Sequence, residues 1–528
     1  KHLSLNFATS VNSSLEELRN IKKFKTMDGL EIDSNSRLVK PLPTAFITAG
    51  VVVLLFIWWQ EACNCALRKK INAPSPKGWP IIGNMLDARK LDGVHLLLCN
   101  YIKNHGKVFS FSMFGKPSLV IADPDILKKI LVKDFWNFRN RFAVIKPKGA
   151  IAKSVFLERD EAWRRIRATL TPSFSAKKMK GMVSLIEDSF ERLMQKLEGV
   201  VNTGESVDML DCFSRMTLEV ILSTAFGVET DIQNDKESLL FKKVKEVFRT
   251  PWIMDILRRF PFGIYLIRIL AQIMRTPRYF EKVASEILQQ RRKTGPTGRQ
   301  DLMHLMLTAN EDSTEKGLSK LTDEEIIGQC QIFLFAGYET SSNTLAYITY
   351  QLALNQNVQD KLREEIKEGV KRNPESSLYD LSHDIEYLDC VINESLRLNP
   401  PLAQVNRECV SDYKFNDIFI PAGLQVIIPV YFLHRDPDVW PNPEKFDPER
   451  FRSPAKDGRH PYQFLPFGLG PRSCIGMRFA LMEIKIALVK FLMKYKFVRS
   501  PETQVPLEIL AGVTLIPKYG VHVRIERV

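Results

Sequence analysis

The sequence predicts a mainly α-helical domain with small β-sheets (an α+β fold class), preceded by a single helix that spans a membrane. Up to about residue 400, the chain is dominated by long runs in which apolar residues recur every three or four positions, the pattern of buried helices. Apolar stretches at 108–113, 118–121, 415–420 and 425–429 predict short strands. The chain has 528 residues, 45% of them hydrophobic, so it can bury a large core.

The predicted membrane segment covers residues 42–60. No charged residue occurs from Leu42 to Trp59, and a helix of that length reaches about 27 Å, near the thickness of the endoplasmic reticulum bilayer. A tryptophan pair marks one interface, and the basic residues 68–70 follow it. We therefore expect a single-pass protein of the endoplasmic reticulum membrane with its main domain in the cytoplasm. The alternative is a cleaved signal peptide, but no small-residue cleavage site follows the apolar run.

The segments around this anchor differ in composition. The first methionine is Met27, so residues 1–26 are expected to be a doubtful N-terminal extension and residues 27–41 a short luminal lead. Residues 61–79 are polar and basic, which predicts a hinge, and the prolines at its end are expected to exclude helix and stiffen the link. No linker or repeat divides residues 80–528, which are expected to form one domain.

Charge narrows the possible partners. The formal net charge is +14, from 75 Lys plus Arg against 61 Asp plus Glu, which suits nucleic acid, an anionic membrane or an acidic protein. No basic run with interleaved aromatic residues occurs, so no nucleic-acid partner is expected. The scattered cysteines indicate a reducing compartment for the main domain.

A long helix is predicted from residue 321 to about 353. Thr322 and Glu325 form a capping box at its start. Inside it, Gly337 is unfavourable in a helix, and Thr340 lies three positions later on nearly the same face. Taken alone, Thr340 is best interpreted as a back-bonded threonine that bends a core helix.

A single cysteine lies in a glycine-rich turn just before an apolar helix pattern. The N–H groups and positive dipole end of that helix favour a thiolate at Cys474, and Arg472 adds a nearby cation. A buried structural thiol and a nucleophile are alternatives. A phosphate cradle fails, because Ser473 stands where a third glycine is needed, and no C-x-x-C supports zinc or a disulfide. An axial thiolate ligand to haem iron remains as a candidate.

The chain resembles the cytochrome P450 family at the fixed positions of its haem-binding signature, which are Phe467, Gly470, Arg472, Cys474 and Gly476. The resemblance covers about residues 74–528 and is closest to the microsomal group of broad-specificity liver drug-metabolising enzymes and thromboxane synthase. It implies the cytochrome P450 fold, a haem b cofactor and Cys474 as the axial iron ligand. It also implies a monooxygenase that inserts one atom of O₂ into a hydrophobic xenobiotic, steroid or lipid.

The same resemblance assigns roles on the distal side. Ala336 and Gly337 resemble the small residues of the oxygen-binding groove, and Thr340 with the neighbouring acid Glu339 resembles the pair that organises water for proton delivery. Family members that rearrange peroxides depart from this threonine. Monooxygenation is therefore favoured, with a haem-thiolate isomerase that needs no reductase as the alternative.

The resemblance also implies partners for the two haem propionates. Trp163 and Arg167 match the family's W-x-x-x-R helix, for which an ordinary basic helix face is the alternative interpretation. The further candidates are Arg472, Arg407 and Arg141. Glu394, Arg397 and Arg450 match a buried structural triad that braces the cysteine loop.

No flavin or nicotinamide domain is recognised in the sequence, so electrons are expected from NADPH through NADPH–cytochrome P450 reductase, with cytochrome b5 as a second candidate partner. The acidic reductase would face basic residues near Cys474, which are Arg164, Arg165, Lys177, Lys178 and Arg478. Membrane lipid is expected to contact the anchor and the apolar segment 251–274, for which two buried helices are the alternative.

Overall fold

The computed structural model describes residues 42–79, 83–91, 93–112, 117–143, 148–248, 276–294, 301–315 and 320–528. The chain forms two compact units, Lys1–Trp58 and Trp59–Val528. The predicted segments 1–26, 27–41 and 251–274 lie outside the described residues.

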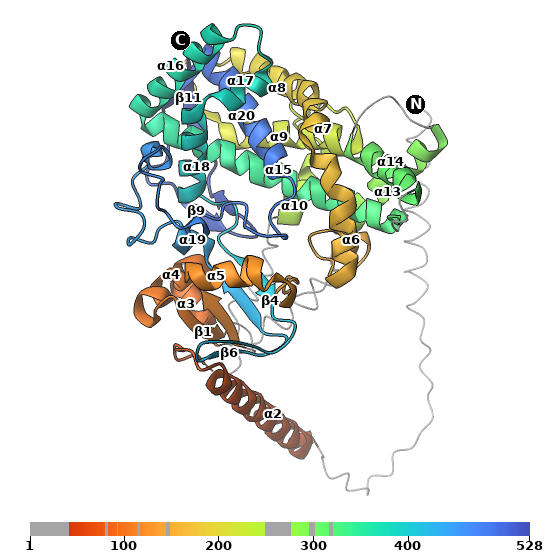
Figure 1. The fold of residues 1–528 in the computed structure, drawn as a ribbon, viewed down its shortest axis with the longest axis vertical. Coiled ribbons are helices and arrows are strands. Elements are labelled where there is room, and N and C mark those ends of the chain that lie inside the picture. Colours follow the sequence, from red (N-terminus) through yellow and green to blue (C-terminus); the bar gives the residue numbers. More distant parts are fainter. Residues whose placement is uncertain are drawn as a thin grey trace, which may run out of the picture. The chain divides into compact units, whose positions relative to one another are not determined.

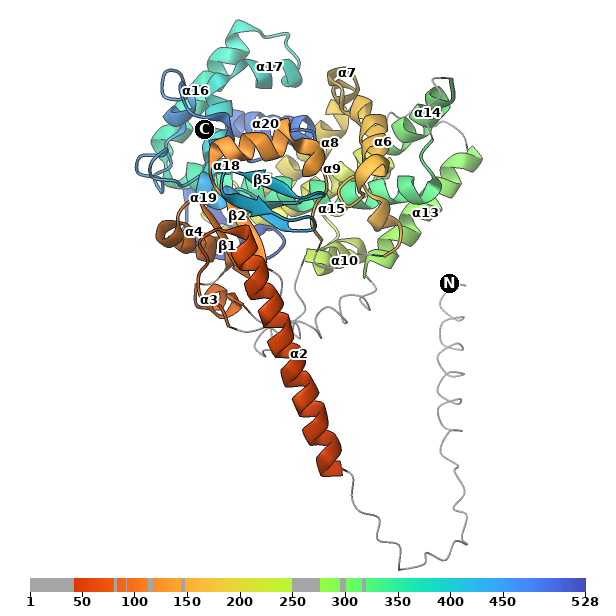
Figure 2. The same ribbon diagram turned by 60° about the horizontal axis from the view of Figure 1, so that its bottom comes forward.

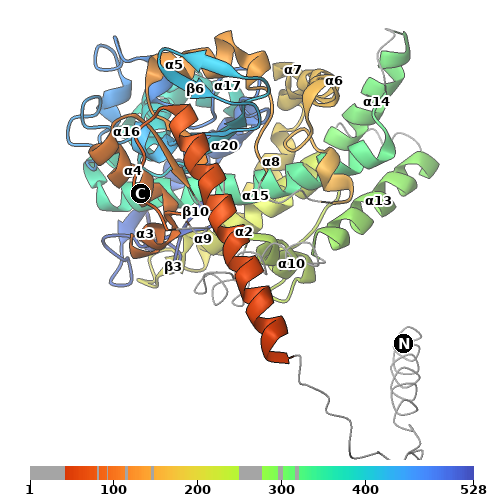
Figure 3. The same ribbon diagram turned by 90° about the horizontal axis from the view of Figure 1, so that it is seen from below.

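Helices make up most of the second unit, as the sequence predicts (Figure 1). The α-helices are α2 (Leu42–Ile71), α3 (Met85–Lys90), α4 (Val94–His105), α5 (Pro124–Lys128), α6 (Asp160–Leu170), α7 (Ala176–Lys180), α8 (Val183–Glu198), α9 (Met209–Ile221), α10 (Leu239–Phe248), α13 (Thr276–Thr294), α14 (Leu302–Glu315), α15 (Asp323–Leu354), α16 (Gln356–Arg372), α17 (Leu378–Asp384), α18 (Glu386–Leu398), α19 (Val430–Leu433) and α20 (Met477–Lys494). Both α13 and α14 pack against α15 (Figure 3).

Among the described residues, the strands form four small sheets, which confirms the predicted α+β class. They are β1 (Val108–Ser112), β2 (Pro117–Ile121), β3 (Val207–Asp208), β4 (Val405–Glu408), β5 (Tyr413–Phe415), β6 (Ile418–Ile420), β7 (Gln425–Ile428), β8 (Tyr495–Arg499), β9 (Ile509–Ala511), β10 (Leu515–Pro517) and β11 (His522–Arg527). The largest sheet has the order β1-β2-β7-β4, so strands from the two ends of the domain lie side by side (Figure 2). Leu119 of β2 pairs with Val426 of β7 in the parallel step.

One predicted strand is wrong in detail. Residues 415–420 were expected to form a continuous strand, but the structure has two strands, β5 and β6, paired as a hairpin. Asn416, at the turn between them, has a positive φ of 49°, a conformation that asparagine tolerates better than most residues.

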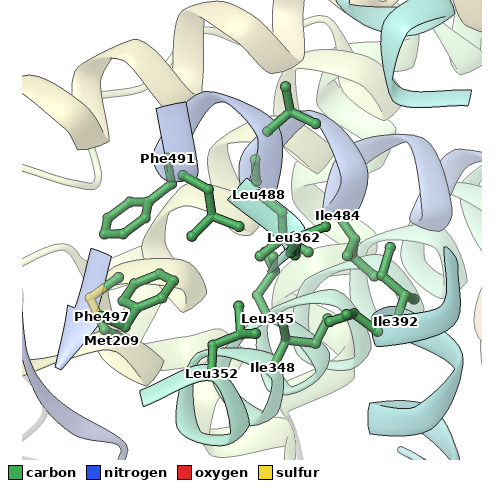
Figure 4. Packing of buried hydrophobic residues seen from close by; sticks show 14 of the residues in the cluster. Met209, Leu345, Ile348, Leu352, Leu362, Ile392, Ile484, Leu488, Phe491 and Phe497 are labelled. Carbon is green, nitrogen blue, oxygen red and sulfur yellow. The ribbon is translucent and has the colours of Figure 1, made fainter. Parts of the chain in front are cut away.

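Helix α15 is the central element of the helical core. The predicted capping box is confirmed, because Thr322 accepts a hydrogen bond from the N–H of Glu325 and the Glu325 side chain accepts one from the N–H of Thr322. The C-terminal half of α15 packs on α20 through buried side chains that include Leu345, Ile348, Ile484 and Leu488 (Figure 4). This contact fixes the two helices that carry the distal and cysteine-side residues described below.

The expected hinge at 61–79 also needs correction, because α2 continues as helix to Ile71. Within the second unit, Asn64 is 5% exposed and Ile71 is fully buried. Helix α2 ends at Asn72, whose positive φ of 57° stops the helix. The prolines that were expected to exclude helix begin only after this point. One stretch of α2, Gly50–Ile71, is long and apolar enough to span a membrane.

Candidate active site

One cavity brings together many of the predicted site residues, and its wall comes from α6, α15, α20, the cysteine loop and β4. The residues that line it are Leu131, Arg141, Val155, Phe156, Trp163, Arg167, Ile332, Phe333, Ala336, Thr340, Ser341, Thr344, Leu396, Pro401, Leu402, Val405, Arg407, Val430, Leu465, Pro466, Phe467, Gly468, Leu469, Arg472, Ser473, Cys474, Ile475, Ala480 and Ile484. Among these residues there are four arginines and neither an aspartate nor a glutamate.

The cysteine loop is held in shape by its own backbone. The N–H of Cys474 donates to the carbonyl of Phe467 at 2.9 Å. Gly470 has a φ of +78°, and a Cβ there would lie 2.0 Å from the carbonyl oxygen of Leu131, so only glycine fits. Gly476 is the N-cap of α20. These contacts place Cys474 at the cavity wall, just before the helix that the sequence predicts.

The environment of Cys474 differs from the expectation in its electrostatics. The Cys474 side chain is exposed, but the surface it exposes faces the cavity. Burial raises the pKa of the thiol, while the N–H of Gly476, Arg167 and Arg141 act in the opposite direction. The helix N-terminus therefore does not by itself make a thiolate. Direct coordination to a metal would deprotonate the sulfur.

The four arginines that line the cavity, Arg141, Arg167, Arg407 and Arg472, are called the cavity arginines below. Burial and mutual repulsion lower the pKa of Arg141 to about 10, of Arg407 to about 9 and of Arg472 to about 8. Burial also lowers the pKa of Arg167. Since guanidinium groups remain charged in proteins, these shifts express the electrostatic cost of gathering cations without an anion.

The hydrogen bonds of the cavity arginines are not equivalent. Arg407 is 2% exposed, and its Nε has no hydrogen-bond partner among the described residues. Arg141 donates to the carbonyls of Phe156 and Arg472, at 3.0 and 3.1 Å. Arg167 donates to the carbonyl of Ser473 at 3.0 Å.

Arg472 has a different arrangement from the one its proposed role suggests. Three of its nitrogen atoms donate to the carbonyls of Arg139, Val155 and Glu158, at 2.8, 3.1 and 2.7 Å. Its guanidinium lies over the ring of Trp163, 4.1 Å from the centroid. Arg472 therefore ties the cysteine loop to the 139–158 segment, besides contributing charge to the cavity.

The cavity fits haem b. A haem is a flat, largely apolar molecule with two carboxylates, and the cavity offers apolar walls, a cysteine and four cations. The Nε of Arg407 supports this fit most strongly, because a buried donor without a hydrogen-bond partner is costly unless a ligand accepts its hydrogen bond.

The predicted distal residues divide between two environments. Ala336 and Thr340 line the cavity. The hydroxyl of Thr340 donates to the carbonyl of Ala336 at 2.6 Å, so Thr340 is back-bonded and still lines the cavity. Gly337 does not line the cavity: a Cβ there would lie 2.9 Å from Cδ1 of Ile221. Its small size serves the close packing of α15 on α9.

Glu339 points away from Thr340 towards the C-terminal sheets. Its carboxyl is 6% exposed and accepts a hydrogen bond of 2.7 Å from the hydroxyl of Thr514. Burial raises the pKa of Glu339 to about 7, and the Thr514 hydrogen bond opposes this rise. Near neutral pH, Glu339 therefore exchanges between acid and carboxylate.

The triad residues lie together, and we call them the Glu394 set: Glu394, Arg397 and Arg450. Arg397 donates to both oxygens of Glu394, at 2.7 and 2.8 Å, and Nε of Arg450 lies 3.4 Å from Glu394. Arg397 also donates to the carbonyl of His434, whose ring accepts from the N–H of Leu465 in the cavity wall. This chain of contacts connects the set to the cysteine loop.

Four residues beside the site have no role in the sequence-based interpretation. Phe156 packs under Arg141 at 4.3 Å, and Ser341 lines the cavity. Thr514 holds Glu339 from more than 170 positions away, with no local signal. Glu483 was detectable, because it interrupts the apolar pattern of α20.

Comparison with known proteins agrees with this geometry. The family model described as Cytochrome P450 matches residues 73–523. Cytochrome P450 3A29 of Sus scrofa is 37% identical over 491 residues, covering 91% of this chain and 96% of that protein. Cytochrome P450 3A9 of Rattus norvegicus is 36% identical, covering 89% and 94%. Cytochrome P450 3A7 of Homo sapiens is 35% identical, covering 92% and 96%.

Proposed function

Because the chain belongs to the cytochrome P450 family and is a haem-thiolate monooxygenase, we propose that it oxidises hydrophobic organic substrates in the endoplasmic reticulum membrane. Its cofactor is haem b, and its electrons come from NADPH through a reductase. The observation that carries the proposal is the cavity that combines Cys474 with the cavity arginines and no carboxylate.

We propose that the cavity arginines and Trp163 hold the two carboxylates of haem, while Cys474 ligates its iron. When bound, haem supplies the activation of O₂, which a cysteine thiolate favours by donating electron density. Phe467, Gly470 and Gly476 would then act through the shape of the loop. The Glu394 set keeps that loop in place from behind.

We propose that Thr340 and Glu339 serve proton delivery on the distal side. The Thr340 hydroxyl reaches the cavity, and it is small enough to share a water molecule with its surroundings. Glu339 is held by Thr514 and titrates near neutrality, so it can take protons at one side of α15 and release them at the other. Ala336 leaves room beside Thr340.

The substrate is proposed to be a lipophilic xenobiotic, steroid or lipid. Apart from its arginines and the hydroxyls of α15, the cavity wall away from the cysteine loop is mostly apolar, with Phe156, Ile332 and Phe333 among its members. An apolar wall gains about 25 cal/mol per Å² of substrate surface removed from water. Cationic substrates would meet no complementary carboxylate there.

The reductase is proposed to dock over the basic residues near the cysteine loop. Arg164, Lys177 and Arg478 are exposed. Arg165 contributes less than expected, because it pairs with Glu325. Product formation should therefore slow as ionic strength rises. Cytochrome b5 is a second proposed electron donor for the same basic surface.

We also propose that α2 anchors the chain as a single-pass segment, with the catalytic domain in the cytoplasm. The apolar stretch Gly50–Ile71 and the basic residues at its end support this orientation. Protease protection of microsomes that contain the protein tests it, because a cytoplasmic catalytic domain should be digested without detergent.

The function is tested with the full-length chain, haem and NADPH–cytochrome P450 reductase. We expect the thiolate-type carbon monoxide difference spectrum of the reduced protein and NADPH-dependent hydroxylation of a hydrophobic substrate. The alternative, an isomerase, has no support in the relatives, and it would instead turn over a lipid hydroperoxide without NADPH. A Cys474→Ser variant that kept the wild-type spectrum would refute the assignment of the iron ligand.

A further inference from the structure

Glu483 is a buried acid that the proposed mechanism does not use. It lies in α20, its side chain is 1% exposed, and its Oε1 has no hydrogen-bond partner among the described residues. Burial raises its pKa to about 8, and the hydrogen bond with the Ser341 hydroxyl opposes this rise. In the part of the chain that the structure describes, no charged side chain contributes to this shift. At neutral pH, Glu483 is therefore mostly a neutral acid that keeps its proton.

Ser341 connects this acid to the cavity. It follows Thr340 in α15, and both residues line the cavity. Ile484, the neighbour of Glu483 in α20, also lines it. The two buried acids therefore flank the Thr340–Ser341 pair, with Glu339 held by Thr514 and Glu483 held by Ser341.

We propose that Glu483 is a positioning residue for proton delivery, which keeps a proton behind Ser341 and passes it to the cavity through the Ser341 hydroxyl. The proposal rests on the monooxygenase function proposed above. Conversion of a C–H bond and O₂ to an alcohol and water consumes two electrons and two protons. The electrons come from NADPH through the reductase, and the structure provides two acids beside the site.

The proton balance of this relay is simple. The O–H bond of Glu483 breaks as a new O–H bond forms on the Ser341 oxygen, and the original Ser341 proton leaves to an acceptor in the cavity. A hydroxyl both donates and accepts hydrogen bonds, so Ser341 needs only to rotate. Ser341 ends unchanged, and Glu483 ends as a carboxylate that solvent reprotonates before the next turnover. No oxidant takes part.

A purely structural role is the competing explanation, since the same hydrogen bond ties α20 to α15. Glu483→Gln separates the two roles, because the amide keeps the size and the hydrogen bond to Ser341 but releases no proton. Ser341→Ala removes the relay. Ser342→Ala is the matched control: Ser342 is also buried in α15, but it donates to the carbonyl of Glu339 at 3.2 Å and does not line the cavity.

The experiment measures the fraction of NADPH electrons recovered in hydroxylated product, in the full-length haem-loaded enzyme with reductase, from about pH 6 to about pH 10. Glu483 is protonated below its pKa, so the wild-type fraction should fall as the pH rises through about 8. Below that pH, Glu483→Gln and Ser341→Ala should lower the recovered fraction several-fold, and in both variants its fall near pH 8 should disappear. Ser342→Ala should keep the wild-type fraction and its fall near pH 8. A Glu483→Gln profile parallel to that of the wild type overturns the proposal.

Infrared difference spectra give a readout that needs no turnover. The wild type should show a protonated-carboxyl band that disappears near pH 8 and is absent in Glu483→Gln. Absence of this band in the wild type overturns the proposal. If the wild type formed no NADPH-dependent product, the proposed function would fail instead, and the infrared band would still report the state of Glu483.

Discussion

The cavity arginines and the Glu394 set hold buried positive charge in opposite ways. Arg397 is fully buried, but both oxygens of Glu394 and two carbonyls accept its hydrogen bonds. Arg407 is just as buried, and it has one carbonyl and no carboxylate. The Glu394 set contains its own carboxylate, whereas no carboxylate lines the cavity beside the cavity arginines and a ligand would have to bring one. The first group therefore stabilises the fold, and the second stabilises a complex.

Removal of a member of the complete set should have the largest effect. Arg397→Ala leaves Glu394 buried without its main partner, which costs about 3–5 kcal/mol in comparable sites. We expect protein that unfolds at lower denaturant concentration and fails to hold haem, measured by urea unfolding and by haem per chain. A normal haem content in Arg397→Ala would contradict this view of the set.

Removal of a cavity arginine, in contrast, should not lower the stability of the apoprotein. Arg407→Met relieves repulsion among buried cations, so the haem-free chain should be as stable as the wild type or more so. Haem binding should weaken by about 1.5–3 kcal/mol, the range for a hydrogen bond to a charged group. The measurements are unfolding of the apoprotein and the rate of haem transfer to a scavenger protein.

Arg159→Met is the matched control for this comparison. Arg159 lies near the same strand but pairs with Glu408 at 2.7 Å and does not line the cavity. Its loss should lower stability slightly and leave haem transfer unchanged. Faster haem loss in Arg159→Met than in Arg407→Met would contradict the proposed division of roles.

Replacement of haem b by its dimethyl ester tests the same contact between Arg407 and a haem carboxylate, and we expect a smaller change in affinity. Haem dimethyl ester has no carboxylates, so it should bind the wild type more weakly than haem b. In Arg407→Met, the difference between the two ligands should shrink, because the missing cation and the missing anion are partners. Equal differences in both proteins would show that Arg407 does not contact a carboxylate.

Glu339 lies between these two groups, because its buried carboxyl has one neutral partner, the hydroxyl of Thr514. Loss of that partner should have the smallest effect. Thr514→Val removes the hydrogen bond that lowers the pKa of Glu339, so that pKa should rise above about 7. Since the acid delivers protons only below its pKa, the corresponding step in product recovery should move to higher pH by up to about one unit, or 1.4 kcal/mol. Thr514→Ser should retain the wild-type step, and a shift to lower pH would contradict the assignment.

Several local features could be predicted because they depend on neighbours in sequence. The capping box at Thr322 and Glu325 needs only a three-residue spacing, and the cysteine turn needs only its glycines before an apolar helix. The helical content and three of the four predicted strands follow from periodicity in the same way. Each of these features is decided within one or two helical turns.

Other features could not be predicted, because the partner lies far along the chain. Gly337 was expected to open the cavity, but the packing of Ile221 from α9 decides which way it faces. Arg472 was expected to bind a propionate; its hydrogen bonds to three carbonyls between residues 139 and 158 are an additional role that the sequence does not indicate. The hinge was expected from composition, yet burial of Ile71 in the domain prolongs α2.

The sequence by itself therefore determined the fold class, the family and the cysteine that lies at the cavity, since short-range patterns carry that information. Only the tertiary structure decided which buried arginines have no carboxylate beside them. Two arginines of similar burial, Arg397 and Arg407, differ because the Glu394 carboxylate lies one helical turn from Arg397, whereas no carboxylate lines the cavity beside Arg407. The cost of a buried charge depends on neighbours within a few ångströms, and the fold chooses those neighbours from the whole chain.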